Sequence, residues 1–84
     1  AKEKHVPVVT VEGNKVVVNV GSVDHPMTPE HYIQFIMIET NLGKQYKGLT
    51  PEDKPHAEVV LQEGEKLVAA YEYCNLHGLW KAEV

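Results

Sequence analysis

The stretch HVPVVTVEGNKVVVNVG, residues 5–21, decides the fold of this chain. Two runs rich in valine stand on either side of EGN (residues 12–14), and a glycine between polar residues is typical of a tight turn. In the second run, the valines at positions 16, 18 and 20 fall on one face of a strand, because side chains along a strand alternate between its two faces. We therefore predict two β-strands joined by a tight turn.

The rest of the chain alternates short apolar runs with polar turns. The segment SVDHPMTPEH (residues 22–31) contains two prolines and predicts a loop, in which Thr28-Pro29-Glu30 can begin one helical turn at most. The later runs are short and lack a long amphipathic helical repeat; they cover residues 32–39, 45–49, 57–62, 66–74 and 79–84. These patterns predict an all-β fold, an antiparallel β-sandwich of about seven short strands.

Length and composition narrow the class of protein. The 84 residues are enough for one small domain, and a hydrophobic content of 43% argues against disorder. The single cysteine excludes a disulfide scaffold and fits a reducing cytoplasm, where we expect the protein to be located. No apolar run of about 18 residues and no signal-peptide pattern is present, so we expect no membrane partner. The net charge of −4 repels phosphate backbones, so we expect no nucleic-acid partner either.

Four histidines and the cysteine fall at predicted strand ends and loops. Cys74 and His77 are separated by two residues where a strand ends and the chain turns. His25 and His31 lie six positions apart in the proline-containing loop, which can present both side chains from one side. His5 lies near the start of the first strand. Functional residues commonly lie at such places, so these five side chains are candidate metal ligands.

The fifth histidine, His56, stands apart from this group. It lies in the polar segment DKPHAE (residues 53–58), with no candidate partner nearby, and we predict a solvated side chain. Taken one at a time, the other histidines are more often surface residues than ligands, and a lone cysteine is more often a small buried side chain. The combination of four imidazoles and one thiol is what favours a metal site.

Three motifs follow one another along the chain: EKHVPV (residues 3–8), GSVDHPMTPEHYI (residues 21–33) and EYCNLHGLWKA (residues 72–82). In sequence and in their H-x5-H and C-x-x-H spacings they resemble superoxide reductase, the catalytic domain of desulfoferrodoxin and neelaredoxin. The resemblance covers residues 3 to 83 and implies an immunoglobulin-like β-sandwich with one mononuclear iron per chain. By motif position, the iron ligands are four equatorial histidines and one axial cysteine: His5, His25, His31, His77 and Cys74.

The resemblance also gives roles to residues beside these ligands. Lys4 corresponds to a lysine that attracts and steadies the superoxide anion, and Glu3 to a glutamate that binds iron in the oxidised state only. We further predict that the backbone amides of Leu76 and of the histidine after it donate hydrogen bonds to the cysteine sulfur. Trp80 is predicted to pack over an imidazole ring.

The ligand set suits redox chemistry. Structural zinc closes a tetrahedron with four ligands, so five donors are one too many. Four nitrogens and one sulfur suit a redox-active transition metal and leave a sixth position for substrate. We therefore expect an enzyme that reduces superoxide by one electron to hydrogen peroxide. The resemblance implies a rubredoxin-like electron donor and a homo-oligomer, either a dimer or a tetramer.

Three alternatives stay open on the sequence alone. One is a β-sandwich with structural zinc at Cys74, His77 and two other histidines. Another is a blue-copper-type electron-transfer protein, although Met27 and Met37 both precede the cysteine. An iron centre can also dismutate superoxide without a donor. Many relatives carry an additional N-terminal iron domain with four cysteines; one cysteine and no C-x-x-C predict a single domain over residues 1–84, without that desulforedoxin-like domain.

Overall fold

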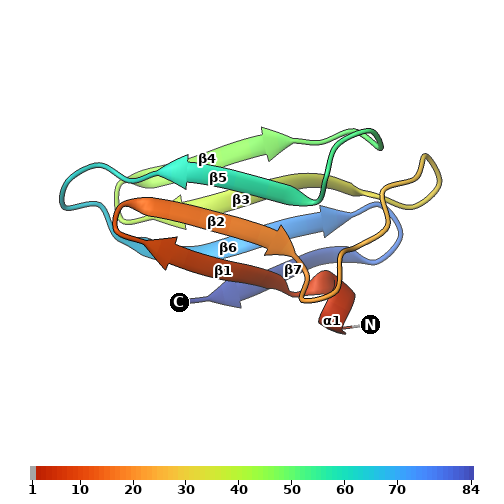
Figure 1. Ribbon diagram of the computed structural model, residues 1–84, viewed down its shortest axis with the longest axis horizontal. Coiled ribbons are helices and arrows are strands. Elements are labelled where there is room, and N and C mark those ends of the chain that lie inside the picture. The colour runs from red at the N-terminus through yellow and green to blue at the C-terminus, as the bar shows by residue number, and fades with distance from the viewer. Residues whose placement is uncertain (1) are drawn as a thin grey trace.

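The computed structural model describes residues 2–84 and confirms the all-β prediction (Figure 1). The described residues form one helical turn and seven strands: α1 (Lys2–His5), β1 (Pro7–Glu12), β2 (Lys15–Val20), β3 (Ile33–Thr40), β4 (Gly43–Gly48), β5 (His56–Val60), β6 (Leu67–Cys74) and β7 (Gly78–Glu83). Every pair of hydrogen-bonded strands is antiparallel. Residues 2–84 contain no helix with the length and apolar character needed to cross a membrane.

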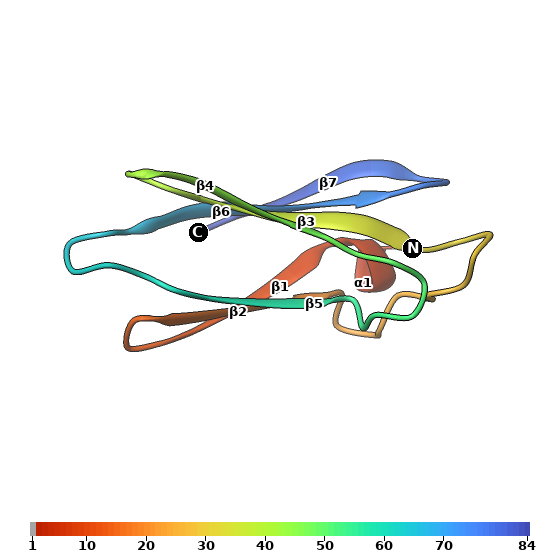
Figure 2. The ribbon, with the colours of Figure 1, turned by 90° about the horizontal axis from the view of Figure 1, so that it is seen from above.

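The strands form two sheets that pack face to face. One sheet has the order β1-β2-β5 and the other the order β4-β3-β6-β7, and Figure 2 shows them as two layers. The valine-rich hairpin that opens the sequence becomes β1 and β2, with Glu12 paired to Lys15 next to the turn. Gly13 in this turn has a φ of 61°, which only glycine adopts without steric cost. The predicted turn is therefore confirmed.

The hydrophobic core lies between the two sheets. Along β2, buried and half-buried side chains alternate, as the valine pattern predicts. Full burial of a large aliphatic side chain contributes about 1.5–3 kcal/mol, so these contacts fix the two sheets against each other. The side chains of the central core cluster with at most 1% exposure are Val16, Val18, Val20, Ile33, Ile36, Ile38, Ala70 and Cys74.

One end of the sandwich brings together segments that are distant in sequence. There β2 ends at Val20 opposite the start of β1 at Pro7. In the other sheet β6 ends at Cys74, which pairs with Ile33 of β3 and with Gly78 of β7. Figure 1 shows α1 and the loop that precedes β3 at this same end. The three sequence motifs therefore converge there.

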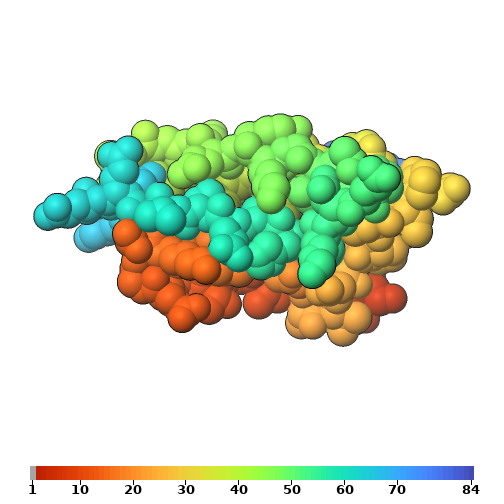
Figure 3. Space-filling model, turned by 45° about the horizontal axis from the view of Figure 1, so that its top comes forward, coloured from red at the N-terminus to blue at the C-terminus, as the bar shows by residue number. Residues whose placement is uncertain are grey.

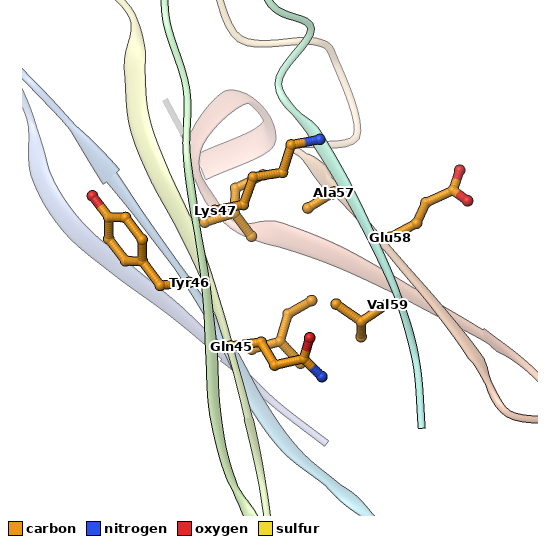
Figure 4. Close-up of a pocket in the computed structure, with 8 residues that line it drawn as sticks. Gln45, Tyr46, Lys47, Ala57, Glu58 and Val59 are labelled. Atoms are coloured by element: carbon orange, nitrogen blue, oxygen red, sulfur yellow. The ribbon is translucent and has the colours of Figure 1, made fainter. Parts of the chain in front are cut away.

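Along one long side of the molecule, the edge strands β4 and β5 lie next to each other (Figure 3). A cavity of about 180 Å³ opens between them and is lined by residues of these strands and of β3 (Figure 4). The lining residues include neither Cys74 nor any histidine. The cavity is therefore separate from the candidate metal ligands.

The one local prediction about helical structure was wrong. No helical turn begins at Thr28, because Thr28 and His31 exchange backbone hydrogen bonds of 3.0 and 3.1 Å and close a tight turn between them. The helical turn that the structure does contain is α1, where the amide of Val6 donates to the carbonyl of Lys2 at 3.0 Å. This turn lies directly before the first candidate ligand.

The prediction that His56 has no nearby partner was also wrong. His56 begins β5, so its side chain lies on the same face of the strand as that of Glu58, two residues later. His56 Nε2 lies 2.9 Å from Glu58 Oε2, and Lys15 Nζ lies 3.1 Å from Glu58 Oε1. The hydrogen bonds from His56 and then from Lys15 lower the pKa of the Glu58 carboxyl. His56 therefore belongs to a surface ion-pair group of the smaller sheet.

Candidate metal centre

Four histidines and the cysteine meet at the end of the sandwich where the motifs converge. We call this group the His/Cys cluster; its members are His5, His25, His31, Cys74 and His77. One ligand atom from each residue lies within 4.8 Å of every other. The helical turn, the loop before β3, the end of β6 and the turn before β7 each contribute to the cluster. The structure therefore brings together all five side chains that the sequence singles out.

The four imidazole rings form a square. Neighbouring ring centroids along the cycle His5, His25, His31, His77 are 4.8, 4.5, 5.1 and 4.7 Å apart, and neighbouring rings meet at 71–87°. The centroids of His5 and His31 are 6.4 Å apart, which makes these two rings one diagonal of the square. Four rings arranged edge to face can each direct one nitrogen towards a common point, as residues that would hold a single metal ion must.

Short distances between side chains identify the potential metal-binding atom of four of the five residues. His5 Nε2 lies 3.0 Å from His77 Nδ1 and 3.3 Å from His25 Nε2. The Sγ of Cys74 lies 3.5 Å from His25 Nε2 and 3.7 Å from His77 Nδ1. Two donors bound to one ion at about 2.1 Å and at right angles stand roughly 3 Å apart, so these spacings suit a shared metal ion.

His31 gives an independent indication of a ligand. Its Nε2 is buried and has no hydrogen-bond partner within residues 2–84. A buried polar atom without a partner costs free energy, so such atoms are rare and call for an explanation. A metal ion at the centre of the square would satisfy this nitrogen. The residues present therefore fit a bound transition metal.

Burial keeps two of the histidines in the neutral form that binds a cation. Cys74, His5 and His25 are buried, His31 is half-buried and His77 is exposed. Desolvation is the main cause that lowers the pKa of His25 and of His31. Both imidazoles are therefore neutral at physiological pH, with a free nitrogen lone pair for a metal ion.

Two contacts orient the rings. The carbonyl of Pro26 accepts a hydrogen bond from His25 Nδ1 at 2.7 Å, which leaves His25 Nε2 as the acceptor that points into the cluster. The indole of Trp80 stacks on His5, with centroids 4.9 Å apart and planes at 24°, and its Nε1 donates to the carbonyl of His77 at 3.3 Å. The hydrogen bonds from the backbone amides of Leu76 and His77 to the Cys74 sulfur stay a prediction.

The helical turn α1 is fixed by the loop that follows β2. The carbonyl of Glu3 accepts a hydrogen bond from the amide of Val23 at 2.9 Å and one from Ser22 Oγ at 3.2 Å. A Cβ added to Gly21 would stand 2.5 Å from the Glu3 carbonyl oxygen and 2.9 Å from the Lys4 carbonyl carbon. Glycine is therefore required for this close approach. Sequence reasoning did not find this role; its only local signal is a glycine directly after the valine run.

We expect Gly21→Ala to displace α1 and with it His5. The added methyl group meets backbone atoms, which cannot move aside as a flexible side chain could. Metal affinity should fall by about tenfold or more, the scale on which misplaced supports of a metal ligand act. Ser22→Ala, which removes only one hydrogen bond to the same carbonyl, is the matched control and should lose much less. Competition with a chelator measures the metal affinity of both variants. Equal affinities for wild type and Gly21→Ala would contradict the role of Gly21 in positioning α1.

Glu3 and Lys4 lie on α1 beside the cluster, and both are exposed. After desolvation and the charges of His77 and His5, the positive charge of Lys4 is the smallest cause that lowers the pKa of His31. A hydrogen bond from its own backbone amide is the main cause that lowers the pKa of the Glu3 carboxyl. Glu3 is therefore ionised near neutral pH, so its carboxylate is a potential oxygen ligand.

The geometry disfavours the two non-iron alternatives. All five donors converge, whereas a structural zinc site uses four. A blue-copper site needs a weak axial methionine, but the Met27 sulfur accepts a hydrogen bond from the amide of Ile33 at 3.5 Å. The larger donor set of the His/Cys cluster suits a redox-active metal such as iron better.

A β-sandwich that gathers four imidazoles and a thiol at one end has the fold and the side chains of a β-protein with a metal-binding site. Residues 1–83 match the desulfoferrodoxin family. The whole chain is 46% identical to a desulfoferrodoxin of Clostridium acetobutylicum, of which it spans 65%. This chain belongs to the desulfoferrodoxin family.

Solved structures agree in fold. The superoxide reductase of Treponema pallidum has a TM-score of 0.94 and 49% identity, with 99% of this chain and 68% of that chain covered. The superoxide reductase of Giardia intestinalis has a TM-score of 0.84 and 32% identity, with 99% and 98% covered. The predicted fold class is thereby confirmed.

Proposed function

We propose that this chain is a superoxide reductase with one mononuclear iron bound by the His/Cys cluster. The observation that carries the proposal is the square of four imidazoles with the buried thiol of Cys74 against it. Two named superoxide reductases share its fold over nearly the whole chain. In each turnover, superoxide would take up one electron and two protons to give hydrogen peroxide. Iron, when bound, supplies that electron and is then reduced again by a donor.

The protein residues set the charge of the centre. Neutral imidazoles add no charge, and one thiolate lowers the charge of a ferrous ion from +2 to +1. A site with net positive charge favours an anionic substrate, although the chain as a whole carries −4. The buried sulfur of Cys74 is shielded from water, and a thiolate ligand donates electron density to the metal.

We assign the attraction of superoxide to Lys4 and a reversible ligand role to Glu3. Lys4 is exposed, directly precedes His5, and carries a positive charge beside the His/Cys cluster. A lysine in this position raises the local concentration of an anion and stabilises negative charge on it. The Glu3 carboxylate is a hard oxygen donor and would bind the metal in its oxidised state, as the family resemblance implies.

We expect Lys4→Ala to slow the bimolecular reaction with superoxide by about tenfold, at the low end of electrostatic steering effects. The wild-type rate should fall as salt is added, because salt screens the attraction, and the variant should show a weaker dependence. Pulse radiolysis or stopped-flow mixing at several ionic strengths measures both. Lys2→Ala, on the same exposed helical turn but farther from His5 in sequence, is the control and should stay near the wild-type rate. An unchanged rate and salt dependence in Lys4→Ala would show that Lys4 does not attract superoxide.

The experiment that tests the proposed function combines metal content with a superoxide assay. About one iron per chain, and stoichiometric peroxide formation that needs an electron donor for turnover, would support superoxide reduction. Catalytic loss of superoxide without a donor would indicate dismutation instead. A colourless zinc protein that stays inactive after loading with iron(II) would contradict the proposal.

The remaining expectations belong to the same proposal. We expect a rubredoxin-like protein as the electron donor, a cytoplasmic location and assembly into a homodimer or homotetramer. These expectations derive from the family resemblance and from the single cysteine. Residues 1–84 would act as one iron-binding domain.

A further inference from the structure

His31 reaches the His/Cys cluster from an exposed turn. The three residues before it, Thr28, Pro29 and Glu30, are all exposed. The backbone groups of Thr28 and His31 bond to each other at 3.0 and 3.1 Å, which closes the turn but does not attach it to either sheet. A metal ligand has to be held within about 0.5 Å of its working position. The turn therefore needs a contact that fixes it against the sandwich.

The side chain of Asn75 makes this contact. Its Oδ1 accepts a hydrogen bond from the backbone amide of Tyr32 at 2.9 Å, and its Nδ2 donates to the carbonyl of Glu30 at 3.0 Å. The backbone amide of Asn75 donates to the carbonyl of Tyr32 at 3.2 Å. The two bonds from the side chain therefore hold the two peptide units that flank His31.

Asn75 is itself fixed by its place in the larger sheet. It directly follows Cys74, the last residue of β6, which pairs with Ile33 of β3. It also begins the turn that carries His77 to the cluster. Asn75 therefore joins the segment that holds two of the candidate ligands to the segment that holds His31, across 43 positions of sequence.

We propose that Asn75 is a positioning residue that holds His31 in the square of imidazoles. Its hydrogen bonds fix the backbone on both sides of His31 and so keep this ring on the diagonal from His5, at a centroid distance of 6.4 Å. Without these bonds the turn gains conformational freedom, and metal binding then has to order it, which lowers the affinity. The proposal rests on a metal ion in the His/Cys cluster, as the proposed function does, but not on the reduction of superoxide.

The same arrangement of hydrogen bonds occurs at the opposite end of the sandwich. Asn41 Oδ1 accepts a hydrogen bond from the amide of Lys66 at 2.7 Å, and the Asn41 amide donates to the carbonyl of Lys66 at 3.0 Å. Its Nδ2 donates to the carbonyl of Gly64 at 3.5 Å. Asn41 thus joins the turn between β3 and β4 to the loop between β5 and β6, far from α1 and the loop before β3 (Figure 1). It makes the contacts of Asn75 without a candidate metal ligand beside it.

Asn75→Ala, with Asn41→Ala as the matched control, separates a role at the metal from a contribution to stability. Each variant loses two side-chain hydrogen bonds, so thermal unfolding of the metal-free chains should show similar losses. With cobalt(II) as the probe ion, competition with a chelator should show that Asn75→Ala lowers the affinity by about tenfold or more. Asn41→Ala should stay close to the wild-type affinity. Equal changes of affinity in the two variants would overturn the proposal.

A double-mutant cycle with His31→Ala identifies the ligand through which Asn75 acts. In a His31→Ala chain, Asn75→Ala should lower the cobalt affinity by about twofold or less, because the ligand that it positions is already absent. A further tenfold loss in that chain would show that Asn75 acts through Cys74, through His77 or through folding as a whole, and would overturn the proposal. The cycle therefore also distinguishes a positioning role from a variant that simply folds poorly.

The absorption of the bound thiolate gives a second readout. Cys74 is held by its pairing with Ile33, so Asn75→Ala at saturating cobalt should keep the sulfur-to-cobalt absorption band of the wild type. Loss of the band would mean that the whole cluster rearranges, and would overturn a role specific to His31. Wild-type affinity in Asn75→Ala would overturn this proposal and leave the proposed function standing. A wild-type chain that binds neither cobalt nor iron would overturn both.

Discussion

In the iron-loaded chain, Cys74→Ser should abolish the visible sulfur-to-iron absorption that the oxidised wild type shows, and should reduce superoxide reduction by about 100-fold or more. The sulfur of Cys74 is buried and approaches two of the imidazole nitrogens. A serine hydroxyl is not ionised near neutral pH, so the centre loses its only anionic protein donor in the cluster. A loss of 100-fold corresponds to about 2.7 kcal/mol, the scale of removing one electrostatic stabiliser from an active site.

The visible spectrum separates this prediction from simple unfolding. The variant should keep the cooperative unfolding transition of the wild type, because serine is close to cysteine in size, and still bind iron more weakly through the imidazoles. His56→Ala is the control, since His56 pairs with Glu58 and is outside the His/Cys cluster. It should retain colour, iron and activity. If the Cys74→Ser chain kept the wild-type absorption band, the band would come from another atom, and Cys74 would not be the sulfur ligand.

Much of the fold could be predicted from local patterns. The alternation of valines in residues 16–20 places one face of β2 in the core, and Gly13 closes the hairpin with a positive φ. These features depend on neighbouring residues only. The wrong prediction of a helical turn concerns a place where local sequence signals compete with contacts that the sequence does not show. At Thr28 the N-cap and proline signals favour a helix, but reciprocal hydrogen bonds with His31 stabilise a tight turn.

The candidate site could be predicted as a set of residues but not as a geometry. The motifs name the four histidines and the cysteine, yet nothing in their spacing gives the square of rings or the diagonal between His5 and His31. The contacts that hold the ligands in place could not be predicted either, because they join residues far apart in sequence. Ser22 binds the carbonyl of Glu3 across 19 positions, and Trp80 stacks on His5 across 75. Only the packing of the two sheets brings these partners together.

Glu72 is a buried acid in the core. It lies on β6, where it pairs with Ile36 on one side and Trp80 on the other, and its side chain is fully buried. Neither carboxylate oxygen has a hydrogen-bond partner within residues 2–84. Desolvation raises the pKa of Glu72 to about 8, because burial penalises the charged form. At neutral pH the folded chain therefore holds this carboxyl in its protonated form.

The metal-free chain should consequently lose stability as pH rises from about 4.5 to about 8. Below the ordinary pKa of 4.5, Glu72 is protonated in both the folded and the unfolded state and contributes no pH dependence. Above it, only the unfolded state ionises freely, so the free energy of unfolding falls until the folded state also ionises near pH 8. The rise of this pKa from 4.5 to about 8 corresponds to at most about 5 kcal/mol.

Glu72→Gln should flatten this profile, because the amide does not titrate. Urea unfolding of the metal-free wild type and variant at pH 5 and pH 8 measures the difference, and the variant should be the more stable of the two at pH 8. The metal-free form is the right one for this test, since a cation bound near Cys74 would itself favour the charged carboxylate. Glu63→Gln, in an exposed turn, removes an acid of the same kind and should keep the wild-type slope. A wild-type chain equally stable at both pH values would show that water or a rearranged side chain solvates Glu72.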